Sequence, residues 1–142
     1  MPPVVKIQLI REEAEPYQIS EPEDINNLLM RYLKNEDREN FVAVLLDSKL
    51  NVNGIHTISI GDSESAIVTP REVFKSAILT NSCSIVVGHN HPSGDPTPSS
   101  ADIEVTKVLI EAGKILKIDV LDHVICGNGK FWSMKMERTL SF

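Results

Sequence analysis

Two histidines and one aspartate between residues 85 and 102 have the residue types and the spacing of a metal site. The segment IVVGHNHPSGDPTPSSAD places His89 and His91 one residue apart, after an apolar strand that breaks at Gly88. Side chains at positions i and i+2 of an extended segment point the same way, so both imidazoles can face one point. A loop stiffened by prolines then brings back Asp102 in the first turn of a helix. The sequence therefore predicts three ligands around one divalent cation.

The chemistry of these groups favours zinc. Neutral imidazoles and carboxylates are both common zinc ligands. A zinc site that performs hydrolysis has three protein ligands and keeps one position for water. Binding lowers the pKa of that water from near 16 to roughly 7, which makes hydroxide available at neutral pH. The end of a strand before a helix is also the usual binding crevice of open α/β sheets. One zinc ion per chain is the predicted cofactor.

Asp102 has an alternative role in helix capping. It stands three residues after Ser99, so the two residues could form a capping box without any role in metal binding. Two other predicted boxes, Ser20–Glu23 and Thr69–Glu72, use glutamate at that place, and the shorter aspartate favours the ligand role. Asp95 could replace Asp102 as a ligand, but its position between glycine and proline favours a turn.

The remaining histidines and the cysteines have simpler interpretations. His123, in the segment LDHVI, could lie near the site and contact a metal ligand without binding the metal itself. A strand histidine with a local hydrogen bond is the favoured interpretation. His56 is predicted to be exposed on its strand. Cys83 and Cys126 lie in apolar runs without CxxC spacing, which favours buried free thiols over a disulfide.

The rest of the chain predicts one α/β domain that positions these residues. Alternating and continuous apolar patterns predict strands at residues 5–9, 41–46, 55–60, 84–87 and 118–126. Helices are predicted to begin at the two capping boxes and at Ser99, the last of them with a C-cap at Gly113. Gly61-Asp62 ends one strand, and Asn128-Gly129 is a hairpin turn. This order gives a layered α/β domain with a mixed sheet.

Length, composition and charge agree with a single soluble domain. The 142 residues, 42% of them hydrophobic, form one predicted domain over 1–142, with residues 1–20 as an N-terminal strand and connector. The net charge of −6 argues against a broad nucleic-acid-binding surface. No apolar run approaches the length of a membrane span, and the start lacks the core of a signal peptide. A cytoplasmic location without a membrane partner is expected.

The histidine motif resembles that of a known family. His89-Asn90-His91-Pro92, the ten residues between His91 and Asp102, and Ser99 three residues before Asp102 resemble the JAMM motif of JAB/MPN metallopeptidase-like domains. The fuller string HNHPSGDPTPS, with TPREVF upstream and LDHVI downstream, resembles the RadC branch. The likeness covers about residues 41–132.

The resemblance implies a fold similar to that of cytidine deaminases, with a mixed β-sheet flanked by helices. It also implies that His89, His91 and Asp102 hold zinc and that Ser99 hydrogen-bonds the oxyanion in the transition state. The JAMM pattern adds a glutamate on an early strand that accepts the proton of the water. Glu39 is the best placed candidate, and its alternative is a solvent-exposed residue in the charged run NEDREN.

The expected function is therefore a zinc-dependent hydrolase of peptide or isopeptide bonds, in a family labelled DNA repair. The alternative is a non-catalytic module that binds metal, DNA or partner proteins. Phosphoester hydrolysis is less favoured, because neither a P-loop nor a second carboxylate cluster is present. RadC proteins commonly carry an N-terminal helix-hairpin-helix region that this chain lacks, so DNA contact is a weaker expectation. The oligomeric state stays open.

Overall fold

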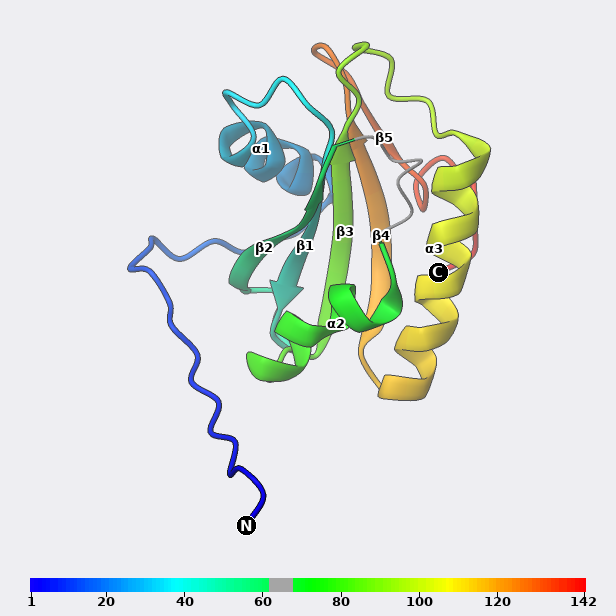
Figure 1. Ribbon diagram of the computed structural model, residues 1–142. Coiled ribbons are helices and arrows are strands. Elements are labelled where there is room, and N and C mark those ends of the chain that lie inside the picture. The colour runs from blue at the N-terminus through cyan, green and yellow to red at the C-terminus, as the bar shows by residue number, and fades with distance from the viewer. Residues whose placement is uncertain (62–67) are drawn as a thin grey trace.

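A mixed β-sheet lies between helices in the computed structural model, which describes residues 1–61 and 68–142 (Figure 1). The strand order across the sheet is β2-β1-β3-β4-β5. Neighbouring strands run antiparallel except β3 and β4, which are parallel and joined through the helix α3. The strand bounds are β1 Asn40–Leu46, β2 Val52–Ile60, β3 Ser84–Asn90, β4 Asp119–Cys126 and β5 Phe131–Ser133. The predicted α/β class with a mixed sheet is confirmed.

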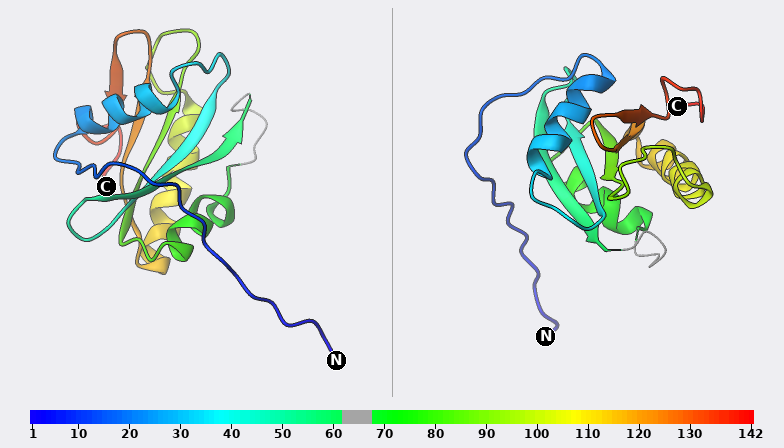
Figure 2. Two further views of the ribbon diagram at one scale, coloured as in Figure 1. Left: turned by 90° about the vertical axis from the view of Figure 1, so that its left-hand side faces the viewer. Right: turned by 90° about the horizontal axis from the view of Figure 1, so that it is seen from above.

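Helices cover both faces of the sheet. α1 (Pro22–Tyr32) lies on one face, and α2 (Pro70–Leu79) and α3 (Ser100–Leu116) lie on the other (Figure 2). All seven positions of β1 are buried, as expected for a strand with both faces covered. Among the described residues, no helix combines the length and the apolar character needed to cross a membrane.

Successive residues of the central strands supply two separate apolar cores, because side chains of a strand alternate between its faces. Val42 and Val44 face α1, where they pack with Ile25 and Leu29. The opposite core holds the following buried residues from β1, α2, β3 and α3: Ala43, Leu45, Phe74, Val87 and Leu109. The sheet is thereby fixed from both sides, which gives the ends of β1 and β3 a rigid base.

α1 begins one residue later than the sequence predicts. Its N-cap is Glu21, and Asp24 closes the capping box by accepting the N–H groups of Ser20 and Glu21 at 2.7 and 3.0 Å. Pro22 explains the shift, because proline has a helical φ and no N–H and is therefore favoured at the first helical position. The predicted N-cap at Thr69 of α2 is confirmed.

α3 continues past Gly113, so the predicted C-cap there is wrong. The helix ends at Leu116, and Lys117 caps it in the left-handed conformation with φ of 61°. Gly113 has a packing role instead, because a Cβ at this position would lie 2.5 Å from the carbonyl oxygen of Ile118. The absence of a side chain at Gly113 lets the chain pass close to α3 before β4 begins.

The strand predicted at residues 5–9 is not formed. Residues 1–17 adopt no regular secondary structure, and Val5 and Ile7 are 78% and 73% exposed. The chain first joins the sheet at Gln18, which forms an isolated antiparallel bridge with Asn51. An alternating pattern identifies a strand only where an edge is available to pair with it, and this segment extends away from the sheet (Figure 1).

β2 ends at Ile60, as predicted. Gly61 follows with φ of 126°, a conformation that L side chains rarely adopt. Asp62, the second residue of the turn predicted here, lies outside the described residues.

The two cysteines differ in exposure. Cys126 is buried, as predicted, and burial raises the pKa of its thiol to about 12. Cys83 is exposed, so the prediction of a buried thiol is wrong there. It precedes the first residue of β3, where the chain leaves the surface turn and enters the sheet. Both thiols are free.

β3 does not break at Gly88 but continues through it to Asn90. The glycine is required by close packing, because a Cβ at this position would lie 2.4 Å from Leu29 Cδ1 of α1 and 3.1 Å from the carbonyl oxygen of Val124. His89 is therefore part of the strand rather than of the loop.

Gly88→Ala is expected to lower the free energy of unfolding by about 1–3 kcal/mol, because the added methyl group overpacks the contact with α1. Chemical denaturation monitored by circular dichroism measures the change. Gly54→Ala is the matched control in β2, where an added Cβ would lie 3.8 Å from Leu45 Cδ1, an ordinary van der Waals distance. Equal destabilisation by the two substitutions would contradict the packing role of Gly88.

Candidate metal centre

Four side chains converge at one end of the sheet. Glu39, His89, His91 and Asp102 each offer one ligand atom, and these atoms all lie within 4.8 Å of one another. His89 Nε2 is 2.9 Å from His91 Nε2 and 3.4 Å from both Asp102 Oδ1 and Glu39 Oε1. His91 Nε2 is 3.2 Å from Asp102 Oδ2. The structure thus brings together the three predicted ligands and the predicted proton acceptor.

Three elements meet to build this cluster. His89 lies near the carboxyl end of β3, and Asp102 lies in the first turn of α3, which begins at the same end of the sheet (Figure 1). β1 runs antiparallel to β3 with Phe41 opposite His89. Continuing this register by two residues places Glu39 opposite His91. The carbonyl of Glu39 also accepts the N–H of Gly61 at 2.8 Å, which anchors this end of β1.

The loop after β3 is fixed by backbone hydrogen bonds. His91 donates its N–H to the carbonyl of Cys126 at 2.8 Å, and Asn128 donates to the carbonyl of Gly94 at 2.9 Å. Asp95 accepts both the N–H and the hydroxyl of Thr97, so its predicted turn role is confirmed and it lies outside the cluster. These contacts hold the His91 backbone in place against the β4–β5 turn.

The ring of His91 is oriented by a backbone carbonyl group that contacts its Nδ1, on the side away from the cluster. Its Nδ1 lies 2.8 Å from the carbonyl oxygen of Asp95, so Nδ1–H donates and Nε2 points into the cluster. The hydrogen bond with Asp102 raises the pKa of His91, although partial burial acts in the opposite direction. His91 therefore presents the nitrogen that a cation would require.

Asp102 serves as both helix cap and cluster member. Its Oδ2 accepts the N–H of Ser99 at 2.8 Å, and its own N–H donates to Ser99 Oγ at 3.1 Å, which completes a capping box. The same carboxylate faces both histidines. Burial alone would raise the pKa of Asp102, but the imidazoles of His89 and His91 beside it outweigh this effect and hold the pKa well below its usual range. The two roles weighed for Asp102 are therefore compatible.

Glu39 and Ser99 border the cluster in different ways. The Glu39 side chain is only 16% exposed and faces His89, so the alternative of a solvent-exposed Glu39 is wrong. Ser99 is exposed at the N-cap of α3, and its hydroxyl oxygen accepts the N–H of Asp102. The hydroxyl proton of Ser99 is not used in that hydrogen bond, so the group keeps a donor.

His123 has a larger role than the sequence predicts. It is fully buried on β4, and its Nε2 lies 2.7 Å from Nδ1 of His89. Its Nδ1 lies 2.6 Å from the hydroxyl of Thr106 on α3. The favoured interpretation, a strand histidine with only a local hydrogen bond, is wrong. Burial lowers the pKa of His123 well below its ordinary value, and a positive charge on His89 acts in the same direction.

Thr106 was not singled out from the sequence. The available signal was the polar residue His123 inside the apolar run of β4, which indicates a buried partner without identifying it. His56, in contrast, is exposed on β2 as predicted and lies 3.0 Å from Ser76 Oγ.

The donor set fits a divalent cation. Two imidazole nitrogens and carboxylate oxygens converge, and these are ligand types of zinc and of other first-row divalent metals. The Nε2 atoms of His89 and His91 lie only 2.9 Å apart, so either a shared proton or a cation must balance their lone pairs. His89 and Asp102 are almost fully buried, which makes the site rigid.

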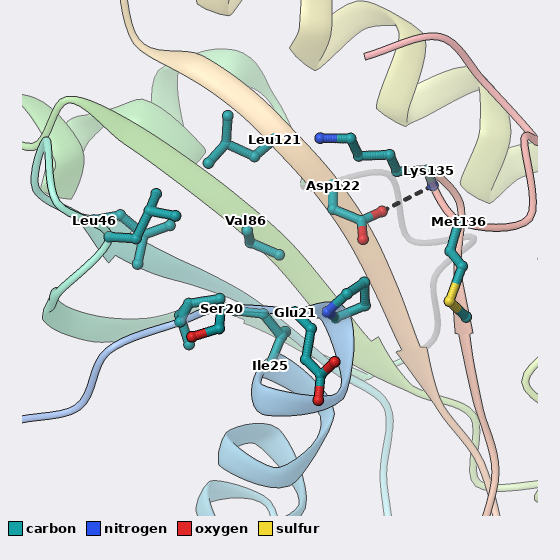
Figure 3. Close-up of a pocket in the computed structure, with 12 residues that line it drawn as sticks. Ser20, Glu21, Ile25, Leu46, Val86, Leu121, Asp122, Lys135 and Met136 are labelled. Carbon is teal, nitrogen blue, oxygen red and sulfur yellow. Dashed lines mark hydrogen bonds between the residues drawn. The ribbon is translucent and has the colours of Figure 1, made fainter.

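A separate pocket of about 420 Å³ lies on the α1 side of the sheet (Figure 3). It is bordered by the start of α1, by β4 and by the segment after β5, and it is mostly apolar. Asp122 faces it and accepts the N–H of Lys135 at 3.0 Å (Figure 3). Burial raises the pKa of Asp122 although Ser133 donates a hydrogen bond to it. The four cluster residues are not among those that line this pocket.

Comparison with known proteins gives matches over most of the chain. A family model of the RadC-like JAB domain matches residues 19–139. A UPF0758 protein of Caldanaerobacter subterraneus subsp. tengcongensis is 50% identical over 127 residues, which cover 89% of this chain and 54% of that protein. UPF0758 proteins of Roseiflexus castenholzii and Methanosarcina mazei are 48% and 46% identical, over 94% and 88% of this chain and 57% and 55% of their own lengths. The chain thus spans about half the length of the curated relatives it matches.

Proposed function

The chain belongs to the RadC-like JAB family, and on this premise we propose that it is a zinc-dependent hydrolase that cleaves peptide or isopeptide bonds. The observation that carries the proposal is the convergence of Glu39, His89, His91 and Asp102 within 4.8 Å. Three of these side chains would hold the ion, and the fourth would handle the proton.

His89 and His91 would bind zinc through Nε2, and Asp102 through its carboxylate. A bound zinc ion supplies a Lewis acid and lowers the pKa of water to near 7. The hydrogen bond from His91 Nδ1 to the carbonyl of Asp95 orients one ring. The capping box at Ser99 orients the carboxylate of Asp102 from the opposite side. The N-terminus of α3 adds a positive field that stabilises this carboxylate.

Glu39 is proposed to move the proton. Its carboxylate lies at the border of the ligand set with Oε1 3.4 Å from His89 Nε2, so a water molecule at the site would be within its reach. It would accept a proton from the attacking water and return it to the leaving amine, as general acid–base catalysis requires. Ser99 would donate its hydroxyl proton to the oxyanion that forms on the scissile carbonyl.

The arrangement supports acyl transfer better than phosphoester cleavage. Many phosphoesterases use two metal ions about 4 Å apart, held by a second set of carboxylates. In residues 1–61 and 68–142, Glu39, His89, His91 and Asp102 form the single group with metal-ligand geometry. One cation, one proton acceptor and one oxyanion donor are the groups that amide hydrolysis needs.

Metal analysis and a peptide assay together test the proposal. Purified protein is expected to bind one zinc ion per chain and to hydrolyse members of a quenched-fluorescence library of linear and isopeptide-linked peptides. His89→Ala is expected to remove both properties. Failure of the wild-type protein to bind zinc would overturn the proposal. Zinc binding without cleavage of any library member would overturn the hydrolase and favour a non-catalytic module.

A further inference from the structure

We propose that Thr106 and His123 are positioning residues that fix the tautomer of His89 and so leave its Nε2 free to bind a cation. The proposal rests on the metal site proposed above and concerns how one of its ligands is prepared. Neither residue belongs to the four-residue cluster.

A continuous chain of three short contacts connects two of the ligands. The hydroxyl of Thr106 lies 2.6 Å from the backbone carbonyl oxygen of Asp102 and 2.6 Å from His123 Nδ1. His123 Nε2 then lies 2.7 Å from His89 Nδ1. This series of contacts begins at the backbone of Asp102 on α3, passes through His123 on β4 and ends on the ring of His89 on β3.

The direction of these hydrogen bonds follows from counting protons. The carbonyl of Asp102 can only accept, and the hydroxyl of Thr106 has a single proton, which must therefore lie between the two oxygens. The hydroxyl then has only lone pairs for His123, so His123 Nδ1–H donates to it. Nε2 of the neutral His123 ring is left as an acceptor, and His89 Nδ1–H donates to it. His89 Nε2 is thereby unprotonated and faces the cluster.

The opposite direction is disfavoured by the same geometry. If Thr106 donated to His123, its oxygen and the carbonyl oxygen of Asp102 would face each other at 2.6 Å without a proton between them. His123 Nε2–H would then donate to His89 Nδ1, and the proton of His89 would lie on Nε2. That proton would point at the position that a cation would occupy.

Burial prevents water from replacing either partner. His89 is 1% exposed, and Thr106 and His123 are fully buried. Phe41 covers both rings, since its centroid lies 5.9 Å from that of His89 in a stacked arrangement and 5.5 Å from that of His123 edge-on. A buried hydrogen bond of this kind has no solvent substitute, so loss of the Thr106 hydroxyl would leave the tautomer of His89 unspecified.

The two histidine ligands reach the same tautomer by different routes. His91 Nδ1 faces the backbone carbonyl of Asp95 on the exposed loop, which can only accept. His89 lies inside the sheet, and its acceptor is a second imidazole whose own tautomer must first be fixed. Thr106 supplies that constraint, and it stands one helical turn after Asp102. Orientation of a ligating histidine through its other ring nitrogen is a general feature of metal sites.

Thr106→Val and Thr106→Ser form the matched test pair. Valine keeps the shape of threonine without its hydroxyl, whereas serine keeps the hydroxyl. Zinc affinity, measured by competition with a chelating indicator, is expected to fall by about 10- to 100-fold in Thr106→Val. Thr106→Ser is expected to bind zinc as the wild type does. Circular dichroism melting shows whether each variant is folded. The variant His123→Gln, whose amide oxygen can still accept a hydrogen bond from His89, gives a second measurement of zinc affinity.

Nitrogen-15 NMR of the histidine side chains in the zinc-free wild type reports the tautomer of His89. A purely structural role of Thr106 would not change this tautomer. His89 is expected as the Nδ1–H tautomer, with Thr106→Val shifting it towards Nε2–H. A wild-type His89 protonated on Nε2, or unchanged zinc affinity in folded Thr106→Val, would overturn the inference while leaving the metal site intact. Absence of zinc binding in the wild type would overturn the proposed function, and the NMR result would still decide the tautomer.

Discussion

Glu39→Gln is expected to lower kcat for peptide hydrolysis by about 10²–10⁴-fold while zinc stays bound. Glutamine keeps the size and the shape of the side chain but cannot accept a proton near neutral pH. The carboxylate of Glu39 is 16% exposed and lies 3.4 Å from His89 Nε2, at the border of the ligand set. Because His89, His91 and Asp102 remain, the variant is expected to retain one zinc ion per chain and a KM close to that of the wild type.

Glu36→Gln is the matched control, because Glu36 belongs to the same charged run but is exposed. Steady-state kinetics and metal content of both variants separate the roles of Glu39. Loss of zinc in Glu39→Gln would show that Glu39 is a ligand and not the proton acceptor. An unchanged kcat would show that another group is the general base.

The three predicted ligands could be placed from the sequence because their geometry is local. His89 and His91 share one face of an extended segment, and Asp102 stands at a defined position of the helix that follows. These relations need only the chain between residues 85 and 102. Glu39 is different, because its position depends on the pairing of β1 with β3 across some 50 residues of sequence. Sequence spacing therefore leaves two interpretations of Glu39 open, and the sheet register places its side chain at the cluster rather than in solvent.

His123 and Thr106 were missed for a related reason. Their contact with His89 depends on β4 lying beside β3 and on α3 packing against β4, which no periodic pattern specifies. Gly88 and Gly113 show the opposite case, in which the local pattern predicts the end of an element at a position governed by packing. Each glycine instead accommodates another part of the chain that approaches where a side chain would lie.

Asp102→Asn is expected to weaken zinc binding far more than it weakens the fold. Asparagine can still accept the N–H of Ser99, so the cap of α3 is retained, and the loss of charge at the helix N-terminus costs only about 0.3–1 kcal/mol. The same loss removes the anionic ligand that would face the cation beside both histidines in a buried site. Removing one partner of a buried charge pair costs about 3–5 kcal/mol, which corresponds to roughly a hundredfold or more in Kd.

Asp95→Asn separates the ligand role of Asp102 from a general effect of charge in the loop. Asp95 is an exposed carboxylate seven residues earlier, and asparagine can still accept the hydrogen bonds of Thr97, so zinc affinity is expected to stay near that of the wild type. Zinc titration and thermal melting of the two variants give the comparison. If Asp102→Asn bound zinc as tightly as Asp95→Asn, the carboxylate would be a helix cap alone, and the cation would need a different third ligand. If it lost the fold together with the metal, the capping box would dominate, and the division between cap and ligand inferred for this side chain would be wrong.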